Sequence, residues 1–305
     1  MPSGPANCWQ LAMVAGACLS VPSCDRIAAL KDQFSGTSAL EGQTPQIVAI
    51  RELYESGECD EALERIAHVT QADPDLADAF YYKGLCHLTR AAASSASILP
   101  LSEEEQASLE AFRRALAVNP RHALASVGIG DVYARHVADR PRRQTREDAT
   151  DPYVLANAAY EKAVSIDPKL PQAQNRYGLF LERTGQLAEA ERAYKAAAEA
   201  AATVPELAPD HYLAYGRFLA GAGGRLEDAL VQYELAHMYR EDDPTIRQEM
   251  AIVHSRLGLR HLERQEYLLA EESLTKAEAM FADRSAPEAR KTTEALAELR
   301  TIRRR

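Results

Sequence analysis

Residues 171–203 read PQAQNRYGLFLERTGQLAEAERAYKAAAEAAAT, and this stretch decides the fold. Each half places apolar and small residues three and four positions apart, which puts them on one face of a helix. These residues are Tyr177, Gly178 and Leu181 in the first half and Ala190, Tyr194 and Ala197 in the second. Gly185 interrupts the pattern where a helix needs a left-handed residue at its end. The stretch therefore predicts two amphipathic helices joined by a short turn.

The same pattern recurs along the chain, with a large apolar or aromatic residue at position 24 and a small residue at position 8 in every unit but the first, which has Ile50 there; the first three units also have proline at position 32. Counted so that Gly178 is position 8, six units lie near residues 43–76, 77–122, 123–170, 171–204, 209–244 and 251–284. The pattern resembles the tetratricopeptide repeat, whose period is about 34 residues. That resemblance implies an all-α solenoid of six antiparallel helix pairs in a right-handed superhelix. We expect residues 285–305 to form a capping helix.

Units two and three contain extra residues between their helices, near 91–104 and 135–151. In the first insert, Ser102 and Glu105 match a capping box that restarts a helix. In the second, Asp151 precedes a proline, as at many helix starts. The second insert is basic, and its arginines are Arg135, Arg140, Arg142, Arg143 and Arg146. This basic insert could contact an acidic partner or anionic head groups, or it could be a solvated loop.

The first 23 residues have no charged side chain. The apolar run 9–21 is too short to span a bilayer but has the length of a secretory signal core. It ends in LSVPSC, which resembles a bacterial lipobox with Cys24 as the lipidated residue. Pro22 and the missing basic residues depart from that pattern. We expect a signal peptide over 1–23, lipidation of Cys24 and a tether over 24–42; an ordinary cleaved signal or a cytoplasmic chain are the alternatives.

Composition and motifs favour a binding protein over an enzyme. The net charge of −10 argues against nucleic-acid binding, which needs a basic face. We find no phosphate-binding loop, zinc spacing or nucleophile motif, so we expect no catalysis, cofactor or metal. His254 and His261 share a helix face, and we interpret them as packing residues rather than metal ligands. Cys59 and Cys86 are interpreted as buried inert thiols.

In the family that the chain resembles, positions 5, 9 and 12 of each first helix line a concave groove that binds partners. The candidate groove residues are Arg51, Tyr54, Tyr81, Leu85, Asp131, Asn175, Leu179, Arg217 and Leu259. The groove lacks the basic clamp by which some cochaperones bind a C-terminal carboxylate. A largely apolar groove suits an amphipathic helix or an extended apolar segment. Alternatively, some of these side chains only pack between neighbouring first helices.

Our leading functional hypothesis is a non-enzymatic scaffold. It would be lipid-anchored, face the periplasm of a bacterial envelope and bind a protein partner during assembly of an envelope complex. Repeat number and the lipobox resemble the pilotin lipoproteins of type IV pilus secretins, which suggests a secretin as partner. The alternatives are a cytoplasmic adaptor or cochaperone and a periplasmic ligand-binding subunit of a solute transporter. Regular repeats argue against the last, because a closed stack leaves little room for a pore.

Overall fold

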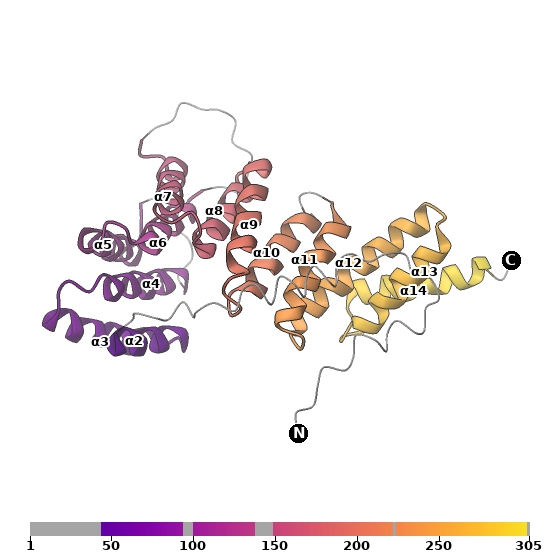
Figure 1. Ribbon diagram of the computed structural model, residues 1–305, viewed down its shortest axis with the longest axis horizontal. Coiled ribbons are helices and arrows are strands. Elements are labelled where there is room, and N and C mark those ends of the chain that lie inside the picture. Colours follow the sequence, from indigo (N-terminus) through magenta and orange to yellow (C-terminus); the bar gives the residue numbers. More distant parts are fainter. Residues whose placement is uncertain (1–43, 94–99, 138–148, 222–223, 304–305) are drawn as a thin grey trace, which may run out of the picture. The chain divides into compact units, whose positions relative to one another are not determined.

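A computed structural model describes residues 44–93, 100–137, 149–221 and 224–303. Within these ranges the regular structure is entirely helical (Figure 1). The first helices of the six pairs are α2 (Pro45–Glu55), α4 (Ala77–Ala93), α6 (Ala123–Ala134), α8 (Pro171–Arg183), α10 (Ala208–Gly221) and α12 (Pro244–Glu263). The second helices are α3 (Cys59–Ala72), α5 (Glu103–Val118), α7 (Pro152–Ile166), α9 (Leu187–Ala201), α11 (Leu226–Tyr239) and α13 (Tyr267–Met280). The last helix is α14 (Pro287–Arg303).

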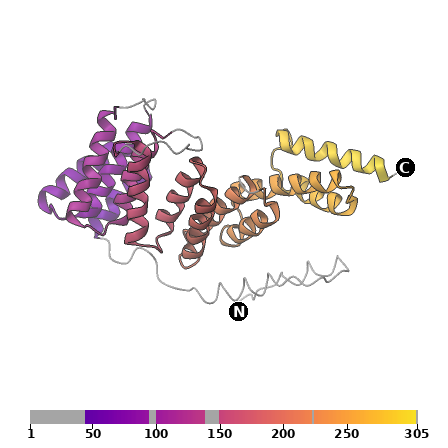
Figure 2. The ribbon, with the colours of Figure 1, turned by 90° about the horizontal axis from the view of Figure 1, so that it is seen from above.

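The helices pack in the order of the chain. Each first helix contacts its own second helix, and it also contacts the first helix of the next unit, from α2 with α4 through to α10 with α12. The first helices therefore form a continuous layer. At the C-terminal end, α14 packs on α12 and α13, and Figure 2 shows it as the yellow helix that lies along the last pair. The predicted all-α solenoid with a C-terminal capping helix is confirmed.

Close contact between the two helices of a pair depends on the small residue at position 8. A Cβ atom on Gly216 would lie 2.4 Å from the ring of Tyr233, and one on Gly130 would lie 2.8 Å from the ring of Tyr160. Both rings are buried. The aromatic side chain at position 24 thus occupies the space where the glycine has no side chain, which is why these two positions recur together in the sequence.

The turns between paired helices also confirm a sequence prediction. Gly57 and Gly185 end their first helices with φ angles of 84° and 82°, in the left-handed region that favours glycine. Gly224 has φ 58° in the fifth unit. In the sixth unit, Gln265 takes the same place with φ 60°. The sixth unit therefore keeps the left-handed turn although it has glutamine in place of glycine.

The helices that follow the two inserts begin at the predicted capping residues. Ser102 and Glu105 form the reciprocal capping box at the start of α5, and Asp151 accepts a hydrogen bond of 2.9 Å from the backbone of Tyr153 at the start of α7. Two boundaries differ from expectation. Helix α4 continues to Ala93, into the first insert, and α12 begins at Pro244 rather than near 251. The early start of α12 follows from Asp243, whose carboxylate caps the helix ahead of that proline.

Candidate partner-binding groove

A cavity of about 340 Å³ opens between the first helices of units one to four. We call it the N-terminal groove and define it by Tyr54, Leu85, Asp131, Arg135, Arg176 and Leu179. Four of these, Tyr54, Leu85, Asp131 and Leu179, are among the groove residues that the repeat pattern predicts. The structure brings them together because they occupy positions 9 and 12 of first helices that contact one another in sequence. Equivalent positions of stacked units then face the same space.

One wall of the groove is apolar. Leu85 and Leu88 of α4 line it together with Leu179 of α8, and Tyr54 of α2 lies at its N-terminal end. Leu179 is accessible to solvent, with 42% of the residue exposed. Exposed apolar surface gathered in a hollow is typical of a site that another molecule covers.

An acidic and a phenolic side chain meet in the same cavity. The Tyr160 hydroxyl donates a hydrogen bond of 2.6 Å to Oδ1 of Asp131, and Oδ2 of Asp131 lies 3.8 Å from Nε of Arg176. Burial raises the pKa of Asp131, although Arg176 and the Tyr160 hydrogen bond oppose the shift. Burial also raises the pKa of Tyr160, and the neighbouring carboxylate adds to that effect. Tyr160 therefore remains a neutral donor to Asp131.

Two arginines line the groove at positions that sequence reasoning did not select. Arg176 has a side chain that is 55% exposed. Arg183 donates hydrogen bonds of 3.2 and 3.1 Å to the carbonyl oxygens of Ala134 and Val137, where α6 ends. A cation at the C-terminal end of a helix is favourable, so Arg183 attaches α8 to α6. Arg176 and Arg183 each lie one residue after a position, 5 or 12, that the repeat pattern assigns to the groove. Counting the charged residues over the whole helix face would have identified both arginines.

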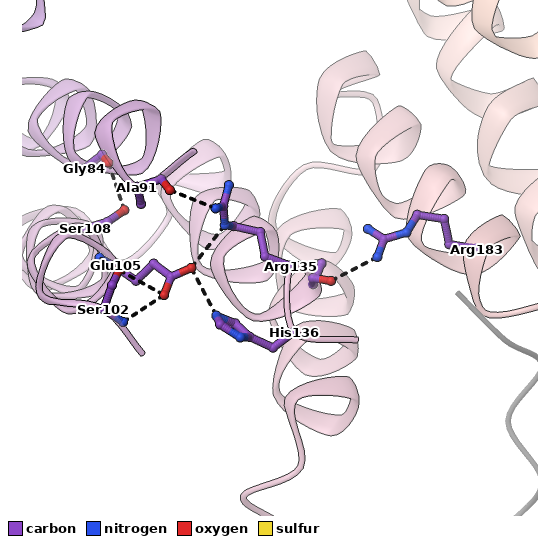
Figure 3. A network of polar contacts seen from close by, with 9 residues as sticks. Gly84, Ala91, Ser102, Glu105, Ser108, Arg135, His136 and Arg183 are labelled. Atoms are coloured by element: carbon purple, nitrogen blue, oxygen red, sulfur yellow. Dashed lines mark hydrogen bonds and ion pairs between the residues drawn. The ribbon is translucent and has the colours of Figure 1, made fainter. Parts of the chain in front are cut away.

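A buried carboxylate joins the second unit to the third (Figure 3). Oε1 of Glu105 accepts a hydrogen bond of 3.1 Å from Nε of Arg135, and Nε2 of His136 lies 3.1 Å from the same oxygen. The backbone N–H of Ser102 donates to the other oxygen at 2.9 Å. Burial alone would raise the pKa of Glu105, but these hydrogen bonds and the nearby histidine hold it below its usual range.

Of the arginines in the basic insert, the structure describes only Arg135. Besides Glu105, its guanidinium donates a 3.0 Å hydrogen bond to the carbonyl oxygen of Ala91 at the end of α4. Arg135 thus connects units two and three within the chain, instead of extending as part of a free basic loop. The other arginines of the insert, together with Cys24, the signal over 1–23 and the tether over 24–42, lie outside the described residues.

The remaining predicted groove residues lie outside the cavity. Tyr81 packs among aromatic side chains, with its ring centroid 6.0 Å from Phe112 and 5.1 Å from His122. Arg51 pairs with Glu55 at 3.7 Å within α2. Asn175 is partly buried on α8, and its Oδ1 has no hydrogen-bond partner among the described residues. These three contribute to the layer of first helices around the cavity.

In the last two units, the predicted groove residues make contacts within the chain. Arg217 of α10 forms a 2.7 Å ion pair with Glu249 of α12. Leu259 of α12 packs against a cluster that includes Leu296 of the capping helix. The cavity described above therefore lies in the N-terminal part of the repeat stack, and α14 covers the corresponding surface at the C-terminal end.

The described residues contain no group of three or more His, Cys, Asp and Glu side chains that could hold a metal ion. His254 is buried. Nδ1 of His261 lies 2.5 Å from Oε2 of Glu266. In the part of the chain that the structure describes, no helix combines the length and hydrophobicity needed to cross a membrane.

Two family models, both for the tetratricopeptide repeat, match residues 48–96 and 106–138 and residues 159–192. The protein contains tetratricopeptide repeats. Its fold is similar to that of PilW, a widely conserved type IV pilus biogenesis factor, with 15% identity and a TM-score of 0.52 over 81% of this chain and 96% of PilW. It is also similar to a thermophilic tetratricopeptide-repeat protein of Thermus thermophilus, with 20% identity and a TM-score of 0.50 over 66% of this chain and 93% of that protein.

A third similar structure is a chain of the APC/C hetero-tetramer Cut9–Hcn1, with 11% identity and a TM-score of 0.51 over 90% of this chain and 46% of that one. No curated protein sequence matches significantly. At these identities the similarities establish the fold. The tetratricopeptide-repeat architecture in turn implies a scaffold for protein–protein interaction.

Proposed function

We propose that the N-terminal groove binds a segment of a partner protein that carries apolar side chains and one acidic side chain. The observation that supports the proposal is the combination, in one cavity, of the accessible Leu179 and the half-exposed guanidinium of Arg176. Burial of a leucine-sized side chain contributes about 1.5–3 kcal/mol. The groove therefore gains affinity from its apolar wall, and Arg176 selects the charge and orientation of the segment.

The basic side chains of the groove differ in how far their charge is already satisfied. Arg135 is paired with Glu105, and Arg183 is bound to carbonyl oxygens. Among the described residues, the one ion-pair contact of Arg176 is the distant one with Asp131, a carboxylate whose ionisation is disfavoured by burial. A carboxylate on the partner would make a shorter, charge-assisted hydrogen bond with Arg176 than Asp131 does. This is why we assign Arg176 the role of anion contact.

The groove is tested by selecting a library of short peptides on the purified protein. We expect the selected peptides to combine apolar residues with Asp or Glu. Leu85→Ala together with Leu179→Ala should weaken their binding at least tenfold, and so should Arg176→Glu. The matched control is Leu268→Ala, because Leu268 is an exposed leucine of α13 away from the groove. Circular dichroism would establish that each variant is folded. Peptides that bind the groove variants as tightly as the wild type would contradict the proposal.

We further propose that Cys24 is lipidated after removal of residues 1–23, so that the groove faces the periplasm and assists assembly of an envelope complex. The motif LSVPSC supports this part of the proposal. The fold shared with a pilus biogenesis factor makes pilus and secretin components the first partners to test. Radiolabelled palmitate should mark the wild type in its native host and should not mark Cys24→Ala. An unlabelled wild type would contradict the lipid anchor.

A further inference from the structure

Cys59 and Cys86 are neighbours at the junction of the first two units. Cys59 is the first residue of α3, and Cys86 lies within α4. Both are buried, with 8% and 0% of the residue exposed, and they belong to one cluster with Ala62. The sequence places them in different repeats, where each looked like an isolated packing residue. Packing of α3 on α4 brings the two thiols together.

Two observations place these side chains next to each other. Cys59 and Cys86 pack in the same buried cluster, and the Cys59 thiol contributes to raising the pKa of Cys86. One helical turn further along α4, Arg90 forms an ion pair with Asp60, the residue that follows Cys59. The ion pair and the thiol contact together hold the start of α3 against one face of α4.

The thiols are adjacent but protected in the folded chain. Burial raises the pKa of the Cys86 thiol, and the neighbouring Cys59 thiol raises it further. Both cysteines are free thiols in the structure. Because the thiolate is the form that reacts, oxidation of this pair would require the chain to be folding or α3 to open from α4. Once formed, a bond at this place would be equally protected from reduction.

We propose that Cys59 and Cys86 form a disulfide that links the first repeat to the second. The oxidant is a small disulfide such as oxidised glutathione. One cysteine thiolate attacks it, forms a mixed disulfide and releases one glutathione thiol. The second thiolate attacks the protein sulfur of the mixed disulfide and releases the other glutathione thiol. The protein loses two protons and two electrons, and the oxidised glutathione gains them. This inference does not depend on the proposed function.

The position of the pair gives the bond a structural role. In a repeat stack, the terminal unit has a neighbour on one side only and is the first to open. The C-terminal unit is covered by α14, whereas among the described helices α2 and α3 make their main contacts with each other and with α4. The disulfide would hold the first unit against the second. Tyr54, which lines the groove, packs against the cysteine cluster, so the bond would also fix one wall of the groove.

The test begins with the full-length protein unfolded in urea and refolded in a glutathione redox buffer. After an acid quench, the free thiols are alkylated and tryptic peptides are analysed by mass spectrometry without reduction. We expect a linked pair made of peptides 52–65 and 84–90, which contain Cys59 and Cys86. Cys59→Ala and Cys86→Ala should each abolish this pair. Refolded wild type with both cysteines alkylated, or linked to Cys8, Cys18 or Cys24, would overturn the proposal.

Thermal unfolding provides a second measurement. We expect the oxidised wild type to unfold at a higher temperature than the same sample treated with dithiothreitol, because the bond closes residues 59–86 into a loop in the unfolded chain. The double variant Cys59→Ala/Cys86→Ala should show no such difference between the two conditions. A linked pair without a higher unfolding temperature would overturn the stabilising role.

Discussion

Tyr160 donates a hydrogen bond from its hydroxyl to Asp131 across 2.6 Å, and the ring of the same tyrosine fills the space beside Gly130. One side chain therefore serves both the packing of α6 on α7 and the polar part of the N-terminal groove. The hydroxyl is directed to Asp131 because the glycine lets the ring approach α6 closely. The repeat pattern that builds the fold thus also positions a group of the candidate site.

Asp131 should make stability depend on pH in a direction opposite to that of most carboxylates. Its pKa is raised in the folded protein, so the folded state binds its proton more tightly than the unfolded state does. The stability that this proton provides is fully present below the unfolded pKa of about 3.9, and it is lost as pH rises through the folded value.

Asp131→Asn keeps an acceptor for Tyr160 and removes this titration. The unfolding free energy of the variant relative to the wild type should therefore increase from about pH 4 to about pH 7. Urea unfolding at several pH values measures it. The exposed Asp228→Asn provides the control, and a flat difference for Asp131→Asn would show that the site does not titrate as described.

Glu105→Gln should destabilise the protein strongly. The substitution removes the charge that pairs with Arg135 and His136 and weakens the capping box of α5. Loss of one partner from a buried ion pair costs about 3–5 kcal/mol. Urea unfolding measures the change. Glu103→Gln changes an exposed carboxylate in the first turn of the same helix and should stay within about 0.5 kcal/mol of the wild type; equal effects from the two variants would contradict the assigned role of Glu105.

Two glycines of α10 should respond oppositely to alanine. A Cβ on Gly216 would lie 2.4 Å from the buried ring of Tyr233, so Gly216→Ala should destabilise by about 1–3 kcal/mol through overpacking. At Gly221 a Cβ would have no neighbour within 4 Å, and Gly221→Ala should stabilise by up to about 1 kcal/mol. Thermal unfolding distinguishes the two results. A tolerated Gly216→Ala would mean that the pair of helices has more room than the structure shows.

Gln265→Gly should stabilise the sixth repeat. Gln265 has φ 60°, where Gly57 and Gly185 occupy the equivalent turns of other units. A left-handed backbone costs a residue with a side chain about 1 kcal/mol relative to glycine. Denaturant unfolding should therefore show a gain of up to about 1 kcal/mol for Gln265→Gly and a loss of similar size for Gly185→Ala. A loss for both variants would indicate that the Gln265 side chain makes a stabilising contact.

The sequence by itself determined the helices, their pairing and their turns. These features depend on residues close together in the chain: the spacing of Tyr177, Gly178 and Leu181, the glycine at 185, and the capping box of Ser102 with Glu105. Such local patterns specify a helix or a turn wherever the unit sits, so one clear repeat could identify the others. The same reasoning selected the groove positions of Tyr54, Leu85, Asp131 and Leu179, because equivalent residues of stacked units face the same side.

Only the tertiary structure decided which residues from different units meet. Arg176 lines the groove beside Asp131, Arg135 pairs with Glu105, and Cys59 packs in one cluster with Cys86. It also showed that α14 packs around Leu259. Each of these contacts crosses from one helix pair to the next or to the capping helix. Their formation depends on how the units pack against one another, and the periodicity of a single unit does not contain that information.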